Sequence, residues 1–308
     1  MKCSVVIPTL NGRDHLATSL DALAAHAPAC EVIVVNGPSA DGTTGMVQNR
    51  DDVAVLLEIS ERTPGVALNA GINMATGDAI AFLNHDLAVE SGWQTAVIDG
   101  LTEAVAVTGP IHQTLPVGMT TTEPESTVIG EKSISLFNMG NVAFRADILN
   151  ELDGFDEYLD AREGIDLAHR INNVGETVSW EANMGVRTEF KTDGGIRQQN
   201  RREKYRALAY TLMKNYGLRF TTAKETIRPP GQDALTSLRA TVTGEMQPTT
   251  WIATGRDVLA GLCDGIRSGA VARVRDRSSV RNPPACSARA ERVVDCYDWR
   301  SSPDSDVR

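Results

Sequence analysis

The sequence AIAFLNHD at residues 79–86 begins as an apolar run and ends on two polar side chains and a carboxylate. Apolar runs without alternation are typical of parallel strands covered on both faces, and such sheets bind ligands at the carboxyl ends of their strands. We therefore expect Asp86 to lie in a ligand-binding cleft. A carboxylate there can hold Mg²⁺ or Mn²⁺ against a diphosphate, because hard cations take oxygen ligands and keep substrate phosphates in their shell. The alternative is that Asp86 only begins a solvated loop or caps a helix.

Apolar segments alternate with helix-compatible segments in the first part of the chain. The apolar segments are residues 4–8, 31–35 and 52–57, and the helix-compatible segments are residues 13–26 and 43–50. This alternation predicts an α/β fold with a mostly parallel, doubly wound sheet and helices on both faces. The chain has no G-x-G-x-x-G after the first strand and no P-loop motif, which disfavours a dinucleotide-binding fold and a P-loop enzyme.

Small and polar residues follow each of the first two strands. The first loop is PTLNG at residues 8–12, and the second is NGPSADGT at residues 36–43. Small residues let a ligand approach the backbone, and Thr, Asn and Asp side chains offer hydrogen bonds to a base and a ribose. Both loops are therefore candidate nucleotide contacts.

Four segments, in this order along the chain, resemble family 2 glycosyltransferases of the GT-A fold. They are SVVIPTLNG at 4–12, VVNGPSADGT at 34–43, GVALNAGINMATGDAIAFLNHD at 65–86 and LDGFDEYLDAREGIDLAHRI at 152–171. The resemblance implies a GT-A type fold and an inverting transferase. Such an enzyme moves a sugar from a nucleotide-diphosphate donor to an acceptor hydroxyl or phosphate.

The resemblance also assigns roles to individual residues. It implies nucleotide-sugar binding by Pro8, Thr9, Asn11, Asn36, Asp41, Asn69 and Asn84. Asp86 corresponds to the last carboxylate of the family's D-x-D element, which binds Mn²⁺ or Mg²⁺, and Asn84 replaces the first. Asn36 stands where the family usually has an aspartate, and its amide oxygen can still accept a hydrogen bond from the base. Leu68 stands where many members have an arginine.

The segment EGID at residues 163–166 stands where family members commonly carry E-D-x-D. Gly164 thus replaces the aspartate that deprotonates the acceptor. A base must lie within hydrogen-bond reach of the attacking hydroxyl, so Glu163 and Asp166 become the candidate catalytic residues. The structural alternative for Asp166 is an ion pair with Arg170 at the i+4 position.

Two other classes of function stay open. Gly164 and Leu68 are also compatible with a catalytically inactive module that binds a nucleotide sugar. A nucleotidyltransferase that makes nucleotide sugars would share the sheet, but it calls for a basic, glycine-rich loop, which residues 8–12 do not supply. The released product separates the three classes. A glycosyltransferase releases nucleoside diphosphate, a nucleotidyltransferase releases pyrophosphate, and an inactive binding module releases neither.

Composition places the chain among soluble enzymes. It has 308 residues, 40 acidic and 30 basic, and a net charge of −10, which disfavours broad nucleic-acid binding. The basic residues are 24 Arg and 6 Lys. This acidic, arginine-rich composition suggests a halophilic or GC-rich source, and on it we base the expectation of archaeal glycan assembly for surface-protein N-glycosylation. Five scattered cysteines indicate reduced thiols.

We expect residues 1–109 to form the nucleotide-sugar-binding half of one GT-A domain and residues 110–217 its acceptor-binding half. An irregular loop is expected at about 111–132, a helical extension at 218–277 and a mostly disordered tail at 278–308. With neither a leader peptide nor an apolar span, the protein is expected to be cytoplasmic. A polyprenol- or dolichol-phosphate-linked sugar remains a possible acceptor.

The helix expected at 250–277 carries an apolar stripe with arginines nearby. The stripe consists of Val258, Leu259, Leu262, Ile266 and Val271. A helix of this kind can lie on an anionic membrane surface at the cytoplasmic face, as a peripheral contact. The alternative is that the stripe packs on the core of the protein.

Overall fold

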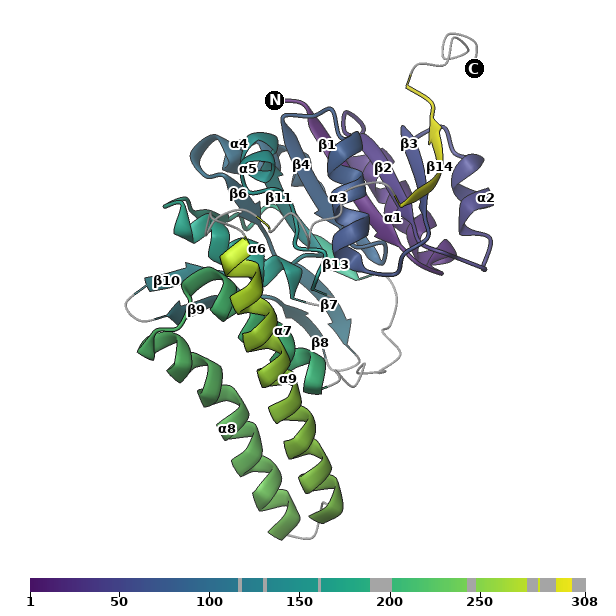
Figure 1. Ribbon diagram of the computed structural model, residues 1–308. Coiled ribbons are helices and arrows are strands. Elements are labelled where there is room, and N and C mark those ends of the chain that lie inside the picture. Colours follow the sequence, from purple (N-terminus) through teal and green to yellow (C-terminus); the bar gives the residue numbers. More distant parts are fainter. Residues whose placement is uncertain are drawn as a thin grey trace.

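The computed structural model describes residues 1–115, 118–129, 132–159, 162–188, 201–242, 248–275, 282 and 292–300. Its large sheet comprises β1 (Cys3–Thr9), β2 (Glu31–Asn36), β3 (Val55–Ile59), β4 (Ala79–Leu83), β6 (Ala106–Thr108), β11 (Asn141–Arg145), β12 (Val178–Trp180) and β14 (Val293–Asp298). The strand order is β12-β6-β11-β4-β1-β2-β3-β14 (Figure 1). Strands β4, β1, β2 and β3 run parallel to one another, whereas β11 and β14 are antiparallel to their neighbours. The predicted mostly parallel α/β fold is confirmed.

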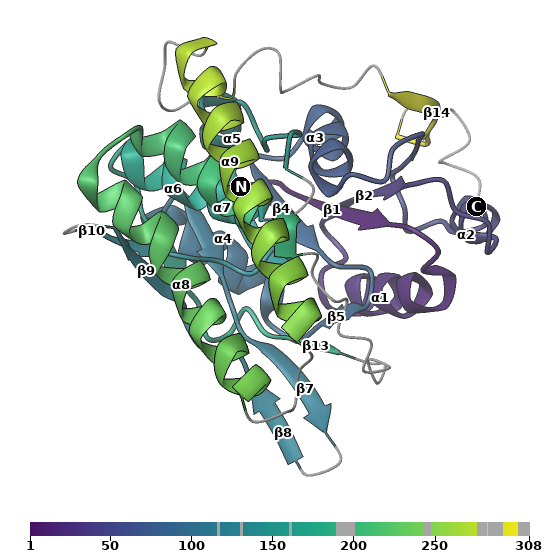
Figure 2. The same ribbon diagram turned by 60° about the horizontal axis from the view of Figure 1, so that its bottom comes forward.

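Helices cover both faces of this sheet because successive strand residues point to opposite sides. Val5 and Ile7 of β1 pack with α1 (Arg13–His26), α2 (Thr43–Gln48) and α4 (Trp93–Glu103). Val6, which lies between them, packs with α3 (Pro64–Met74), α5 (Ala146–Glu151) and α6 (Glu163–Asn173) on the other face. Figure 2 shows α1 and α3 on opposite sides of β1.

The prediction of an irregular loop at about 111–132 is wrong. It forms the strands β7 (Ile111–Leu115), β8 (Gly118–Thr121), β9 (Ser126–Ile129) and β10 (Lys132–Ser135). Strands β7 and β8 pair antiparallel, as do β9 and β10. Strand β7 also joins β13 (Val186–Thr188), which pairs with β5 (Leu87–Val89). The threonines, isoleucines and valines of this segment favour strands, and the largely exposed hairpins need no long apolar run.

Three helices follow, α7 (Arg201–Tyr216), α8 (Phe220–Val242) and α9 (Pro248–Arg275). Helices α8 and α9 lie within the helical extension expected at 218–277, although Pro229 and Pro230 lie inside α8 and proline normally interrupts a helix. Figure 1 shows α8 and α9 extending side by side away from the large sheet.

Helix α9 packs on α7 through a row of glycines at four-residue spacing. A Cβ atom added at Gly261, Gly265 or Gly269 would lie 2.3 to 2.7 Å from a backbone oxygen of α7. The glycine face of α9 therefore makes the contact with α7. The expected apolar stripe stays partly outside, since Leu259 is 64% exposed and Ile266 is 42% exposed.

Part of the segment 278–308 is ordered, contrary to the expected tail. Strand β14 pairs antiparallel with β3 and covers that edge of the sheet. Arg300, just after it, donates to the Glu31 carboxylate at 2.9 Å. Residues 276–281, 283–291 and 301–308 lie outside the described residues. A strand of six residues is too short to be recognised in a polar segment without knowledge of its partner.

Candidate active site

The carboxyl ends of β1 and β2 lie at the same edge of the sheet. Thr9 is the register partner of Asn36, the last residue of β2. The two loops that follow are joined by backbone-to-side-chain hydrogen bonds. Asn11 N–H donates to Ser39 Oγ at 2.8 Å, and Ala40 N–H donates to Asn11 Oδ1 at 2.8 Å. The two predicted nucleotide loops are thus brought together and hold one another in place.

Asp41 also links the loops while remaining exposed. Its carboxylate accepts hydrogen bonds from the Thr43 side chain and from the backbone N–H groups of Arg13 and Thr43. These bonds, of which the one from the Thr43 side chain has the largest effect, lower the pKa of Asp41. Asp41 is therefore a fixed negative charge at the mouth of the loops.

Asn36 and Asn69 are less available than the sequence suggests. Both are buried, and Asn36 accepts from Ser39 Oγ at 2.7 Å and donates to Thr44 Oγ1 at 3.0 Å. Asn69 exchanges hydrogen bonds with the backbone of Phe155 at 2.9 Å in each direction. The described contacts thus give both amides a role in ordering the protein around the site.

Asn84, His85 and Asp86 follow β4 and lie beside the first loop. A Cβ atom on Gly12 would lie 2.5 Å from His85 Cδ2 and 2.9 Å from Thr9 Oγ1. Burial lowers the pKa of His85, although Asp86 nearby acts in the opposite direction. His85 thus lies beside the first candidate nucleotide loop, and its position between Asn84 and Asp86 was the one clue to this in the sequence.

Asp86 is half-buried and is the residue that would hold a divalent cation. Within the described residues, no group of three or more His, Cys, Asp or Glu side chains is arranged to bind a metal ion. One carboxylate beside two loops suits an ion that takes its other ligands from a substrate diphosphate and from water, as Mg²⁺ often does. The residues present therefore fit a metal that arrives with the donor.

The candidate base helix, α6, begins at Glu163. Glu163 is 8% exposed, and its Oε2 atom has no hydrogen-bond partner among the described residues. Burial raises the pKa of this carboxyl group. A carboxylate with a raised pKa and an available oxygen is well suited to accept a proton.

Gly164 and Gly140 connect the base helix with the end of β4. A Cβ atom on Gly164 would lie 2.6 Å from Met139 Cγ, and one on Gly140 would lie 2.8 Å from Asn84 Nδ2. The adjacent residues Met139 and Gly140 therefore contact α6 and Asn84, respectively. This segment holds the start of the base helix close to the strand end that precedes Asp86.

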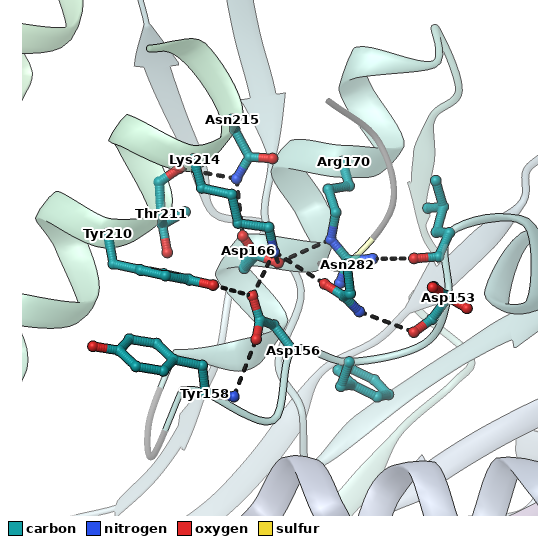
Figure 3. A network of polar contacts seen from close by, with 12 residues as sticks. Asp153, Asp156, Tyr158, Asp166, Arg170, Tyr210, Thr211, Lys214, Asn215 and Asn282 are labelled. Atoms are coloured by element: carbon teal, nitrogen blue, oxygen red, sulfur yellow. Dashed lines mark hydrogen bonds and ion pairs between the residues drawn. The ribbon is translucent and has the colours of Figure 1, made fainter. Parts of the chain in front are cut away.

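Asp166 occupies a different environment from Glu163. It is fully buried and pairs with Arg170 Nε at 2.8 Å and with Lys214 Nζ at 2.9 Å (Figure 3). Although burial alone would raise the pKa of Asp166, the two cations and the Asn215 amide hold it well below its usual range. The ion pair with Arg170 is the structural alternative that the sequence raised for Asp166.

The network around Asp166 joins segments that lie far apart in the sequence. Lys214 of α7 also donates to Asp156 Oδ2 at 2.6 Å and to Asn282 Oδ1 at 3.0 Å (Figure 3). Two carboxylates thus face two cations, which balances the buried charge. No sequence pattern indicated Asp156, Lys214 or Asn282 as partners of Asp166.

Known proteins resemble this chain in sequence and in fold. Residues 4–146 match the sequence model described as Glycosyl transferase family 2. The Pre-mycofactocin glycosyltransferase of Mycobacterium tuberculosis (strain CDC 1551 / Oshkosh) is 26% identical over 216 residues, which cover 61% of this chain and 43% of that protein. Glycosyltransferase AglE of Haloferax volcanii is 25% identical over 193 residues, which cover 58% of this chain and 63% of the relative. The chain thus spans less than half the length of the mycobacterial relative.

Solved structures share the fold at lower identity. Mannosyltransferase PcManGT from Pyrobaculum calidifontis, in complex with GDP-Man and Mn²⁺, superimposes with a TM-score of 0.53 at 17% identity. The superposition covers 90% of this chain and 88% of that one. S. aureus TarS 1–349, in complex with UDP-GlcNAc, gives a TM-score of 0.59 at 15% identity over 90% of this chain and 92% of that one. Residues 4–146 thus match the glycosyl transferase family 2 model, and the chain is built on the GT-A fold.

Proposed function

We propose that this protein is an inverting glycosyltransferase that moves a sugar from a nucleotide-diphosphate sugar to an acceptor. One observation carries the proposal. The strand end bearing Asp86 lies beside the joined nucleotide loops on one side, and through Met139 and Gly140 it is connected to the start of the Glu163 helix on the other. A donor site and a candidate base thus flank the same strand end.

In this proposal the donor is held by the loop residues Thr9, Asn11 and Asp41, with Pro8 and Asn84 beside them. Asp86 would hold Mn²⁺ or Mg²⁺, and that ion, when bound, would offset the charge that develops on the leaving diphosphate. Two solved structures that share the fold, PcManGT and GalNAc-T7, contain Mn²⁺. Asn36 and Asn69 contribute by ordering the loop and the α3 contact rather than by facing the donor.

Glu163 is the proposed base. Its buried position and raised pKa favour proton acceptance, whereas the Asp166 carboxylate is occupied by Arg170, Lys214 and Asn215. A carboxylate held by two buried cations is a weak base, because protonation would leave those cations uncompensated. We therefore propose that Asp166 is a positioning residue that holds α6 against α7.

The exposed stripe on α9 supports a proposed contact with a membrane surface and, through it, a lipid-linked acceptor. Among the helices that the structure describes, none combines the length and the apolar character that spanning a bilayer requires. Leu259, Ile266 and Val271 are exposed, with Arg256 and Arg267 nearby. An apolar stripe flanked by arginines can enter the interface of an anionic bilayer. The acceptor would then be a polyprenol- or dolichol-linked glycan intermediate of protein N-glycosylation or polysaccharide assembly.

A donor screen tests the proposed reaction. The protein is incubated with a panel of UDP-, GDP- and dTDP-sugars and Mn²⁺, and thermal stabilisation and released nucleotide are both measured. We expect one donor class to raise the melting temperature as its concentration rises. The protein should also hydrolyse this donor slowly and release nucleoside diphosphate. Release of pyrophosphate from a sugar phosphate and a nucleoside triphosphate would indicate a nucleotidyltransferase instead. Stabilisation without turnover, even with lipid-linked acceptors, would indicate an inactive binding module.

A further inference from the structure

A cavity lies next to the base helix, between α6, α7, α8 and the β9–β10 hairpin. Its volume is about 170 Å³, roughly ten times the space that one buried water needs. Apolar side chains, among them Ile129, Leu136 and Leu208, form part of its wall. The polar residues that line it are Thr127, Arg162, His169, Thr211 and Glu225. The cavity is thus large enough for a phosphate-sized group and has both apolar and polar walls.

Arg162 is the main charge in this cavity. It immediately precedes Glu163 and has a left-handed backbone, with φ at 69°. The residue is half-buried, and its guanidinium makes no hydrogen bond or ion pair with any residue in the described part of the chain. Loss of hydration on burial lowers the pKa of Arg162. A partly desolvated guanidinium that forms no direct ion pair is costly to bury, and a bound anion would reduce that cost.

A second polar group in the cavity also lacks a partner. Thr211 is only 3% exposed, and its buried hydroxyl has no hydrogen-bond partner among the described residues. His169 faces Tyr216 through Nδ1, at 2.8 Å from the Tyr216 hydroxyl. Buried hydroxyl groups are normally hydrogen-bonded, so an orphaned one that lines a cavity points to a missing ligand or water.

We propose that Arg162 and Thr211, with His169, form a subsite for a phosphate-type anion carried by the acceptor. The inference rests on the proposed function, because the subsite lies one residue from the proposed base Glu163. A guanidinium binds a phosphate through two parallel hydrogen bonds, and a hydroxyl adds a third donor. The apolar wall suits the first carbons of an alkyl chain attached to that phosphate. The proposed acceptor is therefore a phosphate ester.

Among the described residues, Glu225 supplies the one carboxylate that lines the cavity, and it provides a control of opposite sign. It makes no ion pair with Arg162 in the structure. A carboxylate on the same cavity repels a bound anion, so neutralising it should strengthen anion binding. Removing the positive charge of Arg162 should have the opposite effect.

Calorimetric titration with inorganic phosphate and with hexyl phosphate tests the subsite. We expect Arg162→Gln to weaken binding of both by about 10-fold or more, as the loss of a charge-assisted hydrogen-bond pair does. Arg162→Lys should retain part of the affinity, Thr211→Val should weaken binding a few-fold, and Glu225→Gln should strengthen it. Arg219→Gln, which changes an exposed arginine just before α8, is the matched control and should bind as the parent does.

The two probes distinguish a free anion from the head of a longer molecule. Tighter binding of hexyl phosphate than of inorganic phosphate supports an ester acceptor, whereas equal binding overturns the ester assignment. Unchanged binding in Arg162→Gln, with a melting temperature that shows a folded protein, overturns the subsite itself. Loss of phosphate binding in Asp86→Ala but not in Arg162→Gln would place the phosphate in the donor site instead.

The binding titration does not depend on turnover, so it separates this inference from the proposed reaction. If the donor screen fails while phosphate binding still depends on Arg162, the transferase proposal is wrong and the subsite is not. If transfer occurs, Arg162→Gln should raise the KM for a phosphate-bearing acceptor and leave the KM for the donor within a few-fold. A rise in the donor KM alone would show that Arg162 serves the donor and would overturn the acceptor assignment.

Discussion

The side chain of Met139 fills the space that a side chain at Gly164 would need. A Cβ atom on Gly164 would lie 2.6 Å from Met139 Cγ and 2.7 Å from Met139 Sδ, closer than side chains approach one another in real structures. The aspartate that family members commonly carry at this position cannot enter without moving Met139. The glycine at position 164 and the placement of Met139 are thus two parts of one packing arrangement.

We expect Glu163→Gln to lower turnover by about 10² to 10⁴-fold, the usual cost of losing a general base. The amide keeps the shape of the side chain but cannot take the proton from the acceptor. Steady-state kinetics with the donor identified in the screen measure the effect, and the donor KM should change little. Turnover within a few-fold of the parent would show that the base lies elsewhere.

Asp166→Asn serves as the contrasting variant. Because it removes a buried negative charge that faces Arg170 and Lys214, we expect a loss of about 3–5 kcal/mol in the free energy of unfolding. Denaturant unfolding measures this loss. A stable Asp166→Asn protein with greatly reduced turnover would instead make Asp166 the base.

Gly164→Asp should destabilise the protein by about 1–3 kcal/mol through overpacking against Met139. Met139→Ala in the same chain should recover part of that loss, because it opens the space that the aspartate needs. A double-mutant cycle from denaturant unfolding measures the coupling, which we expect at about 0.5–3 kcal/mol. Additive effects would show that Met139 is not what excludes the side chain.

Asp86→Ala should abolish metal-dependent transfer while the protein stays folded. The carboxylate would hold the cation against the leaving diphosphate, and its removal raises the reaction barrier by several kcal/mol. Activity is measured over a range of Mn²⁺ and Mg²⁺ concentrations, with circular dichroism to verify folding. Full activity of the parent in excess chelator would contradict the metal assignment.

His169 should make the stability of the protein depend on pH in the weakly acidic range. Burial lowers its pKa from 6.5 to about 4, with Arg162 acting in the same direction and Asp166 against it. The unfolded chain therefore binds a proton more readily than the folded protein between these values. Stability from this group is present above pH 6.5 and is lost as the pH falls towards 4. His169→Gln should flatten that part of the stability profile, and an unchanged slope would contradict the assignment.

The exposed stripe of α9 should carry binding to anionic membranes. Leu259→Asp places a negative charge on the apolar face and should reduce cosedimentation with phosphatidylglycerol vesicles several-fold. Val294→Asp on β14 is a matched control, since Val294 and Leu259 are both 64% exposed. Equal loss in both variants would indicate a general charge effect, and no binding by the parent would refute the membrane contact.

Local patterns in the sequence were sufficient for the α/β architecture and for the position of the donor loops. The alternation of apolar and helical segments predicts the parallel strands β1 to β4, because period and composition reflect burial directly. The carboxyl ends of parallel strands share one edge of the sheet, so the loops at Thr9 and Asn36 and the end of β4 were predicted to lie near one another.

The tertiary structure decided the features that depend on contacts between distant segments. Asp166 became a buried ion-pair partner because Lys214 and Asn215 approach it from α7, and Asn36 and Asn69 became internal links because their partners fold around them. The apolar stripe of α9 stayed partly exposed because α9 packs on α7 through Gly261, Gly265 and Gly269 instead. A sequence pattern records which side chains prefer burial, but the partner that buries or charges each one is set by packing across the whole fold.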